Sequence, residues 1–411
     1  MKPSDPMNIA LWRDGAAITL LLIATLKIMA NATISPALPA LEASFATDAN
    51  AAYLTRFLVS APSLTVVLVA PFAGIFCDRY GRRGLLLAGL VLFATAGTAG
   101  LYLPDLQAIV ASRLVLGVAV AMVMTAQVAL VGDMYVGARR SGFMGLQVAA
   151  INFSGFAYIS MAGALATVSP RFPFLIYALP ALLLPLVFLT LGARASKGTG
   201  GGHGGSGGTI SEAGQVVEQA SQAAWLLPVL ATAALAVLTV MMFFMMPSQV
   251  PFYLDESGFD SASATAFVLG ALTLTGGVVA MLFSRIKEWC GTPMTFAAGF
   301  ALMGAGFVLL GTQANWMALL PGAALIGAGY ALVQPALLLL ALQLAPAHRR
   351  GSASGMMTTS LFLGQIISPF ALTPFIQASG FASVFLGAAV VLAVLAMSAC
   401  LVPILRRRSR G

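Results

Sequence analysis

Two basic residues stand alone inside long apolar stretches, and their side chains are the ones best placed to do chemistry. Lys27 lies near the middle of the apolar run 16–35, and Arg113 lies inside the run 106–131. At a helical rise of about 1.5 Å per residue, Arg113 is roughly 10 Å from the start of its run. A charge inside a bilayer is costly and marks a functional site by default. The two residues therefore predict an interior that holds an anion, or a Lys27 that carries a proton.

Polar but uncharged residues fall within the same kind of apolar run. Asn31 follows Lys27 by about one helical turn, so both side chains are expected on one face of a helix. The other candidates for a polar interior wall are Gln127, Gln147, Asn152, Gln249, Gln334 and Gln365. Hydrogen bonding between helices is the alternative role for each of them. None of the apolar runs contains Asp or Glu in its interior, so the interior charges are all positive.

The sequence offers no arrangement typical of an enzyme, a metal site or a cofactor site. Its three cysteines and two histidines lack metal-ligand spacing, and no phosphate-binding loop is present. We therefore expect no catalysis, no metal and no cofactor. The net charge of +8 would favour a nucleic-acid partner in a soluble protein, but membrane topology explains it better, so none is expected.

Composition places these residues in a membrane. Hydrophobic residues make up 59% of the 411 residues and charged residues only 8%, against about 25% charged in soluble domains. Twelve runs approach the roughly 20 residues that a helix needs to cross the hydrocarbon core. They are 16–35, 54–76, 84–103, 106–131, 142–167, 172–191, 223–246, 263–283, 293–312, 317–344, 352–377 and 381–404. The expected fold is an all-α integral membrane protein with twelve transmembrane helices in two six-helix bundles.

The distribution of Lys and Arg predicts the orientation of these helices. If the N-terminus is cytoplasmic, 17 of the 21 basic residues fall on the cytoplasmic side. The exceptions are Arg56 and Arg171 near the other side, and Lys27 and Arg113 within runs. The positive-inside rule then predicts two cytoplasmic termini in a bacterial-type inner membrane. The first run is long enough to span, so no cleavable signal peptide is expected.

A polar segment divides the chain into two halves. Residues 192–221 are polar, and eight of the eleven residues in 198–208 are glycine, which is typical of a flexible tether. The predicted organisation is a first bundle at 1–191, a cytoplasmic linker at 192–221 and a second bundle at 222–411. Paired arginines followed by glycine at equal spacing in both halves indicate an internal repeat, and such repeats typically rock about a shared cavity.

The most specific motif lies between the second and third runs. It reads Gly74-x-x-x-Asp78-Arg79-x-Gly81-Arg82-Arg83. It resembles the signature loop of the major facilitator superfamily, which occupies the same place between two helices. Gly81 permits a tight turn, and Gly74 is expected to let a neighbouring helix approach closely. Asp133 ends the fourth run and is expected to pair with Arg79 or Arg82. The resemblance implies that these residues form a gate, which holds the bundles together on the cytoplasmic side.

Further segments resemble the drug and metabolite exporters of this superfamily. Arg113-x-x-x-Gly117 is similar to a fourth-helix arginine that is associated there with proton coupling. Pro36 and Pro39 resemble the end of the first helix in many exporters. One element departs from the pattern, because Ser160 stands where drug–proton antiporters have a proline. This departure puts the antiporter subtype in doubt but not the superfamily.

These observations predict a secondary active transporter without enzymatic activity. The expected function is proton-linked export of a small organic compound, with an anion among the candidates, by a monomer in the lipid bilayer. An importer, a uniporter or a lipid translocator of the same fold is the first alternative, motivated by the missing interior carboxylate. A membrane sensor or assembly factor that does not transport is the second. The intact motif from Asp78 to Arg83 favours transport.

Overall fold

The computed structural model describes residues 14–48, 50–135, 137–191, 212–346 and 349–408. Every regular element in these ranges is a helix. The first half contains α2 (Gly15–Ala32), η1 (Ser35–Ala37), α3 (Leu38–Ser44), α4 (Ala51–Tyr80), α5 (Arg82–Thr98), η2 (Ala99–Leu101), α6 (Leu106–Met134), α7 (Gly137–Ala166), η3 (Phe172–Leu182) and α8 (Leu183–Leu191). The second half contains α9 (Glu212–Phe243), α10 (Met245–Glu256), α11 (Ser261–Thr312), α12 (Trp316–Leu344) and α13 (Arg350–Arg408).

The described helices account for twelve membrane crossings. Ten helical segments are long and apolar enough to cross a membrane by length and composition. Two of them, α11 and α13, span 52 and 59 residues and are broken inside by glycines with positive φ: Gly291 at 74° and Gly380 at 79°. Glycine takes such angles without the steric cost that a Cβ would bring. Each long helix therefore crosses twice, and the predicted all-α, twelve-helix fold is confirmed.

Several predicted runs have different internal structure from a single α-helix. The run 172–191 is divided into η3 and α8, and Pro180 lies inside η3. Proline removes a backbone donor and disfavours a regular α-helical turn. The predicted linker also differs, because α9 begins at Glu212 and residues 212–221 are helical. Residues 192–211 lie outside the described residues, so the domain boundaries stay a prediction.

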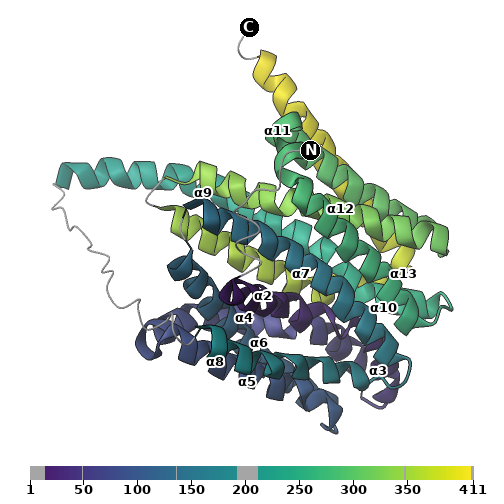
Figure 1. Cartoon of the computed structure of the whole chain (residues 1–411). Coiled ribbons are helices and arrows are strands. Elements are labelled where there is room, and N and C mark those ends of the chain that lie inside the picture. The colour runs from purple at the N-terminus through teal and green to yellow at the C-terminus, as the bar shows by residue number, and fades with distance from the viewer. Residues whose placement is uncertain (1–13, 49, 136, 192–211, 347–348, 409–411) are drawn as a thin grey trace, which may run out of the picture.

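The two halves form two bundles that pack side by side. In Figure 1 the first half, purple to teal, lies below the second half, green to yellow. Contacts between the halves are made mainly by α7 with α11 and by α4 with α13, and α10 contacts η1, α3 and α4. Within the first bundle, α6 approaches α4 so closely that a Cβ at Gly117 would lie 2.2 Å from the carbonyl oxygen of Pro62. Small residues permit such close approach between membrane helices.

The paired bundles have two ends, which different elements mark. The motif end is the end at which α4 turns into α5 at Gly81, and the far end is the end at which α3 and the C-terminal part of α10 lie. α3 and α10 lie together in Figure 1, across the structure from the N-terminal part of α9. Polar contacts between the bundles differ at these two ends.

Candidate functional site

A small group of polar side chains joins the two bundles in the apolar interior. Asn31 Nδ2 donates to Gln365 Oε1 at 3.0 Å and to Ser63 Oγ at 3.5 Å, and Ser63 Oγ donates to Gln365 Oε1 at 2.5 Å. Asn31 and Ser63 come from α2 and α4, whereas Gln365 comes from α13. We call these three residues, together with Lys27, the inner polar site. The sequence indicated Asn31 and Gln365 but missed Ser63, whose only signal is a hydroxyl in an apolar run.

Lys27 lies one turn before Asn31 on α2 and is half-buried. Within the described part of the chain, its amine has neither a hydrogen-bond nor an ion-pair partner. In those ranges the amine is not among the polar atoms that are both fully enclosed and without a partner, so it retains some accessible surface. An ammonium at this depth is stable only if it faces water, a ligand or another polar group. Lys27 is therefore placed to meet water or a ligand next to the hydrogen bonds that join the bundles.

Arg113 has a different environment from the one that the sequence suggested. Its side chain is fully buried, and its guanidinium carbon lies 4.2 Å from the ring centroid of Tyr177 and 4.6 Å from that of Phe174. Cations are attracted to aromatic faces at such distances, most strongly where water is excluded. None of its three nitrogens has a hydrogen-bond partner among the described residues. Both rings belong to η3, so Arg113 lies in the closed core of the first bundle and not at an open interior wall.

The remaining predicted wall residues lie in several different environments. Gln127 Nε2 donates to Gln147 Oε1 at 3.5 Å, which links α6 to α7 within the first bundle. Asn152 packs against Gly277, where an added Cβ would lie 2.9 Å from the Asn152 Cβ, so it belongs to the closed contact between α7 and α11. Gln334 on α12 is half-buried, and it has no hydrogen bond to another residue in the described ranges.

A second polar group joins the bundles at the far end. Arg56 donates from Nη1 to Glu42 Oε2 at 2.8 Å and from Nε to Gln249 Oε1 at 3.1 Å. Gln249 Nε2 donates in turn to Thr373 Oγ1 at 3.0 Å. The guanidinium carbon of Arg56 also lies 3.8 Å from the ring centroid of Phe252. We call Glu42, Arg56, Gln249, Phe252 and Thr373 the far-end cluster. Gln249, predicted as an interior wall residue, is therefore part of this cluster.

The sequence did not reveal this cluster because its members look unrelated along the chain. Glu42 follows the first run, and Arg56 begins the second, so each resembles a charge at a membrane edge. The signal that was available is their opposite charge on consecutive elements, α3 and α4, with a short connection between them.

At the motif end, the described contacts of Arg82 and Arg83 stay within the first bundle. Arg82 forms the predicted ion pair with Asp133, and its Nη1 also donates to the carbonyl oxygen of Ala129 at 3.3 Å. Arg83 Nη2 donates to the carbonyl oxygen of Phe188 at 3.4 Å, and its guanidinium carbon lies 4.8 Å from the Phe188 ring centroid.

The glycines of the motif differ from each other. Gly81 has a φ of 84° and makes the predicted tight turn between α4 and α5. At Gly74, by contrast, an added Cβ would meet no atom within 4 Å, so the predicted close approach of a helix is wrong for this conformation.

The first arginine of the motif, Arg79, is exposed. The side chain of Asp78 lies outside the described residues, and its predicted role stays a prediction.

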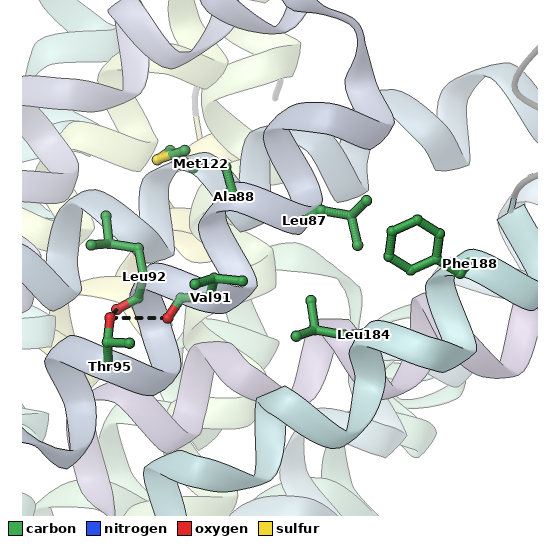
Figure 2. Close-up of a pocket in the computed structure, with 8 residues that line it drawn as sticks. All are labelled: Leu87, Ala88, Val91, Leu92, Thr95, Met122, Leu184 and Phe188. Carbon is green, nitrogen blue, oxygen red and sulfur yellow. Dashed lines mark hydrogen bonds between the residues drawn. The ribbon is translucent and has the colours of Figure 1, made fainter.

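An apolar groove of about 630 Å³ lies away from the inner polar site. Figure 2 shows its lining residues, which come from α5, α6 and α8: Leu87, Ala88, Val91, Leu92, Thr95, Met122, Leu184 and Phe188. These helices belong to the first bundle, and α5 and α8 pack mainly against other helices of that bundle. The groove is thus on the outer surface of the first bundle.

Two six-helix bundles that share polar groups at their contact, with apolar outer faces, define a multi-span membrane transport protein. The chain belongs to the Major Facilitator Superfamily, whose sequence profile matches residues 20–369 and 290–411. It is a transporter of this superfamily and not an enzyme.

Curated relatives match only part of the chain. Multidrug resistance protein 2 of Bacillus subtilis is 30% identical over 118 residues, which are 29% of this chain and 30% of that protein. Quinolone resistance protein NorA of Staphylococcus aureus is 27% identical over 117 residues, 28% of this chain and 30% of that protein. The matches thus span under a third of the relatives' length. The solved structure of a D-xylose-proton symporter has the same fold, with a TM-score of 0.71, 17% identity and coverage of 92% of this chain and 96% of that one.

The ion pair at the motif end gives a first testable prediction. We expect Asp133→Asn to reduce transport several-fold. The free energy of unfolding should fall by about 1 kcal/mol or less, because the side chains of Asp133 and Arg82 are partly exposed and ion pairs of this kind contribute little to stability. Transport and thermal unfolding are measured on the same purified variant. Asp105→Asn is the matched control, since that aspartate makes no side-chain cap at the start of α6. Wild-type transport in Asp133→Asn would mean that the pair has no gating role.

Proposed function

We propose that the protein is a secondary active exporter of a small organic anion and that it works by alternating access. The observation that carries this proposal is the inner polar site, where side chains of both bundles are joined. Next to them lies the amine of Lys27, which has no partner among the described residues. An anion that replaces the hydrogen bond between Asn31 and Gln365 would touch both bundles at once. Its binding free energy could then favour one arrangement of the bundles over another, which is the requirement for coupling.

The distribution of contacts supports an access direction in this conformation. The far-end cluster links α3 and α4 to α10 and α13, whereas the described contacts of Arg82 and Arg83 stay within one bundle. We propose that the conformation is closed at the far end and that a ligand enters from the motif end. Arg82 and Arg83 then engage the second bundle only in the opposite state.

Export and proton coupling have separate support. The partial similarity to two proteins named for multidrug and quinolone resistance favours export. Lys27 is the candidate proton carrier, because no Asp or Glu lies in the interior of an apolar run. The same absence favours the second candidate function, an importer or uniporter that needs no proton.

Flux through reconstituted protein tests these proposals. The purified full chain is placed in liposomes, and a panel of aromatic and aliphatic acids is compared with neutral analogues, with and without a pH gradient. Accumulation of acids that depends on the gradient supports proton-linked transport of anions. Transport that ignores the gradient supports a uniporter, and no flux of any compound supports a sensor or assembly factor.

The proposed orientation gives a second prediction. We propose that the motif end and both termini face the cytoplasm of a bacterial-type inner membrane. In a variant with Cys77, Cys290 and Cys400 replaced by serine, a membrane-impermeant maleimide applied to intact cells should label Ala46→Cys at the far end and spare Ser206→Cys in the linker. Labelling of Ser206→Cys before lysis would contradict this orientation, and labelling after lysis confirms that the cysteine is accessible.

A further inference from the structure

The groove in Figure 2 is open to the surface and almost entirely apolar. Its lining residues on α5 run from Leu87 to Thr95, a distance of about 12 Å along the helix. Leu184 and Phe188 of α8 form the opposite wall. One leaflet of a bilayer supplies about 15 Å of hydrocarbon, half of the roughly 30 Å core. The groove therefore has the length and the chemistry to take one acyl chain of a lipid.

The groove exists because α5 and its neighbours are close at one end and separated at the other. Towards the far end, Gly97 and Gly100 of α5 and η2 lie against Tyr177 and Phe174, so closely that a Cβ at Gly97 would be 2.5 Å from the Tyr177 Cβ. Towards the motif end, the exposed Val91 of α5 and Phe188 of α8 leave open space between the helices. The opening is thus on the part of the surface that is nearest to the motif.

A basic side chain stands at the motif-end edge of the groove. Arg83 lies one helical turn before Leu87, and its guanidinium lies over the ring of Phe188, which lines the groove. Unlike Arg82 and Arg139, which pair with Asp133 and Asp14, Arg83 has no carboxylate partner among the described residues. Its Nε is buried and also lacks a hydrogen-bond partner within the described ranges. The one hydrogen bond of Arg83 in those ranges is from Nη2 to the carbonyl oxygen of Phe188, so Nη1 is left to contact a lipid head group.

The start of α5 adds a second attraction for an anion. The helix begins at Arg82, and its N-cap, Gly81, offers no side chain to the first-turn amides. These amides have no partner within the helix, and the helix dipole makes this end positive. A phosphate that contacts Arg83 can also reach this end of the helix. The apolar groove and the positive edge together match one kind of molecule, in which an anionic head is joined to an acyl chain.

We propose that this groove binds an anionic phospholipid, with one acyl chain against Leu87, Val91, Leu184 and Phe188 and the phosphate against Arg83 and the first turn of α5. The lipid would fill the open side of the first bundle next to the gating motif. It would fix the start of α5, and with it the turn at Gly81, through contacts that no protein side chain in the described part of the chain supplies.

Lipid retention by the purified full chain tests the proposal. Delipidated protein in detergent receives dioleoyl phosphatidylglycerol or dioleoylglycerol, which has the same acyl chains but no phosphate, and the bound lipids are counted by native mass spectrometry while thermal unfolding is followed separately. Wild-type protein should retain phosphatidylglycerol about tenfold better, as expected for one charge-assisted contact. Arg83→Gln should remove most of this preference, and Arg83→Lys should keep part of it. Arg139→Gln, which removes a charge at the same end, should behave as wild type.

The groove itself is tested by filling it. Val91→Trp should reduce the retention of both lipids. Ala88→Phe is the alternative variant if Val91→Trp does not fold, and it should reduce the retention of both lipids to a smaller extent. Val390→Trp is the matched control, since Val390 is exposed on α13 outside the groove. Equal retention by Val91→Trp, Ala88→Phe and Val390→Trp would overturn the proposal. Unchanged lipid preference in Arg83→Gln, or equal stabilisation by soluble glycerol phosphate, would overturn it as well.

Discussion

Lys27→Ala should weaken the binding of an anionic substrate by about 10- to 100-fold, the range expected when one charge-assisted contact is lost. The reason is that Lys27 supplies the positive charge of the inner polar site and has no partner among the described residues that would hold it elsewhere. A neutral analogue should lose much less affinity, because it never made the contact. Binding to purified protein is measured for an acid and for its amide or ester in parallel.

The same variant separates the two roles that Lys27 can have. If Lys27 carries the coupled proton, Lys27→Ala should abolish accumulation driven by a pH gradient and spare the exchange of substrate across the membrane. Lys27→Arg keeps the charge but holds its proton, so it should bind the anion and fail to couple. Lys287→Ala is the control, since that lysine lies outside the predicted runs. Wild-type binding and coupling in Lys27→Ala would leave Lys27 without a role in transport.

The crossings were predictable because they depend on composition alone. A run of about 20 apolar residues has few alternatives in a chain with 8% charged residues, so each run corresponds to a crossing in the structure. The motif was also predictable in part. Its arginines and Asp133 lie at helix ends that are close in any such bundle, and Arg82 forms the expected pair.

Side-chain partners inside the bundles could not be predicted, since they depend on how each helix is rotated. Asn31 and Gln365 are 334 positions apart and meet only because α2 and α13 present these faces to each other. Arg113 shows the opposite outcome. Its partners are aromatic rings of η3, about 60 residues later in the chain, and nothing in the local sequence distinguishes a stacked arginine from one that lines a cavity.

The stacked environment of Arg113 indicates a role in packing the first bundle. A buried cation that the described residues contact through ring faces contributes little net stability, because its desolvation cost opposes its attraction to the rings. Its side chain extends from α6 to the rings of η3 and so contributes to the packing of the first bundle in this conformation. The substrate hypothesis consequently rests on Lys27 alone, and the charge preference of the inner polar site is that of a single lysine.

The far-end cluster is expected to control the position of the bundles. Arg56→Gln removes the cation that joins Glu42 to Gln249 and stacks on Phe252, and it leaves the carboxylate of Glu42 only 28% exposed without its ion pair. Loss of one partner of a partly buried pair costs about 1–3 kcal/mol here, less than for a fully buried pair. This corresponds to a shift of about 5- to 150-fold in the ratio of far-end-open to far-end-closed molecules.

Distances between spin labels at Ala46 and Glu256, in the variant without native cysteines, report this shift. Arg56→Gln should add a long-distance population, and the double variant with Glu42→Gln should lose part of it, because no unpaired carboxylate remains. Arg171→Gln is the matched control. Arg171 also lies near the far end, but it donates to the carbonyl oxygen of Leu103 within the first bundle at 2.8 Å. Equal distance distributions in Arg56→Gln, Arg171→Gln and wild type would show that the cluster does not hold the far end closed.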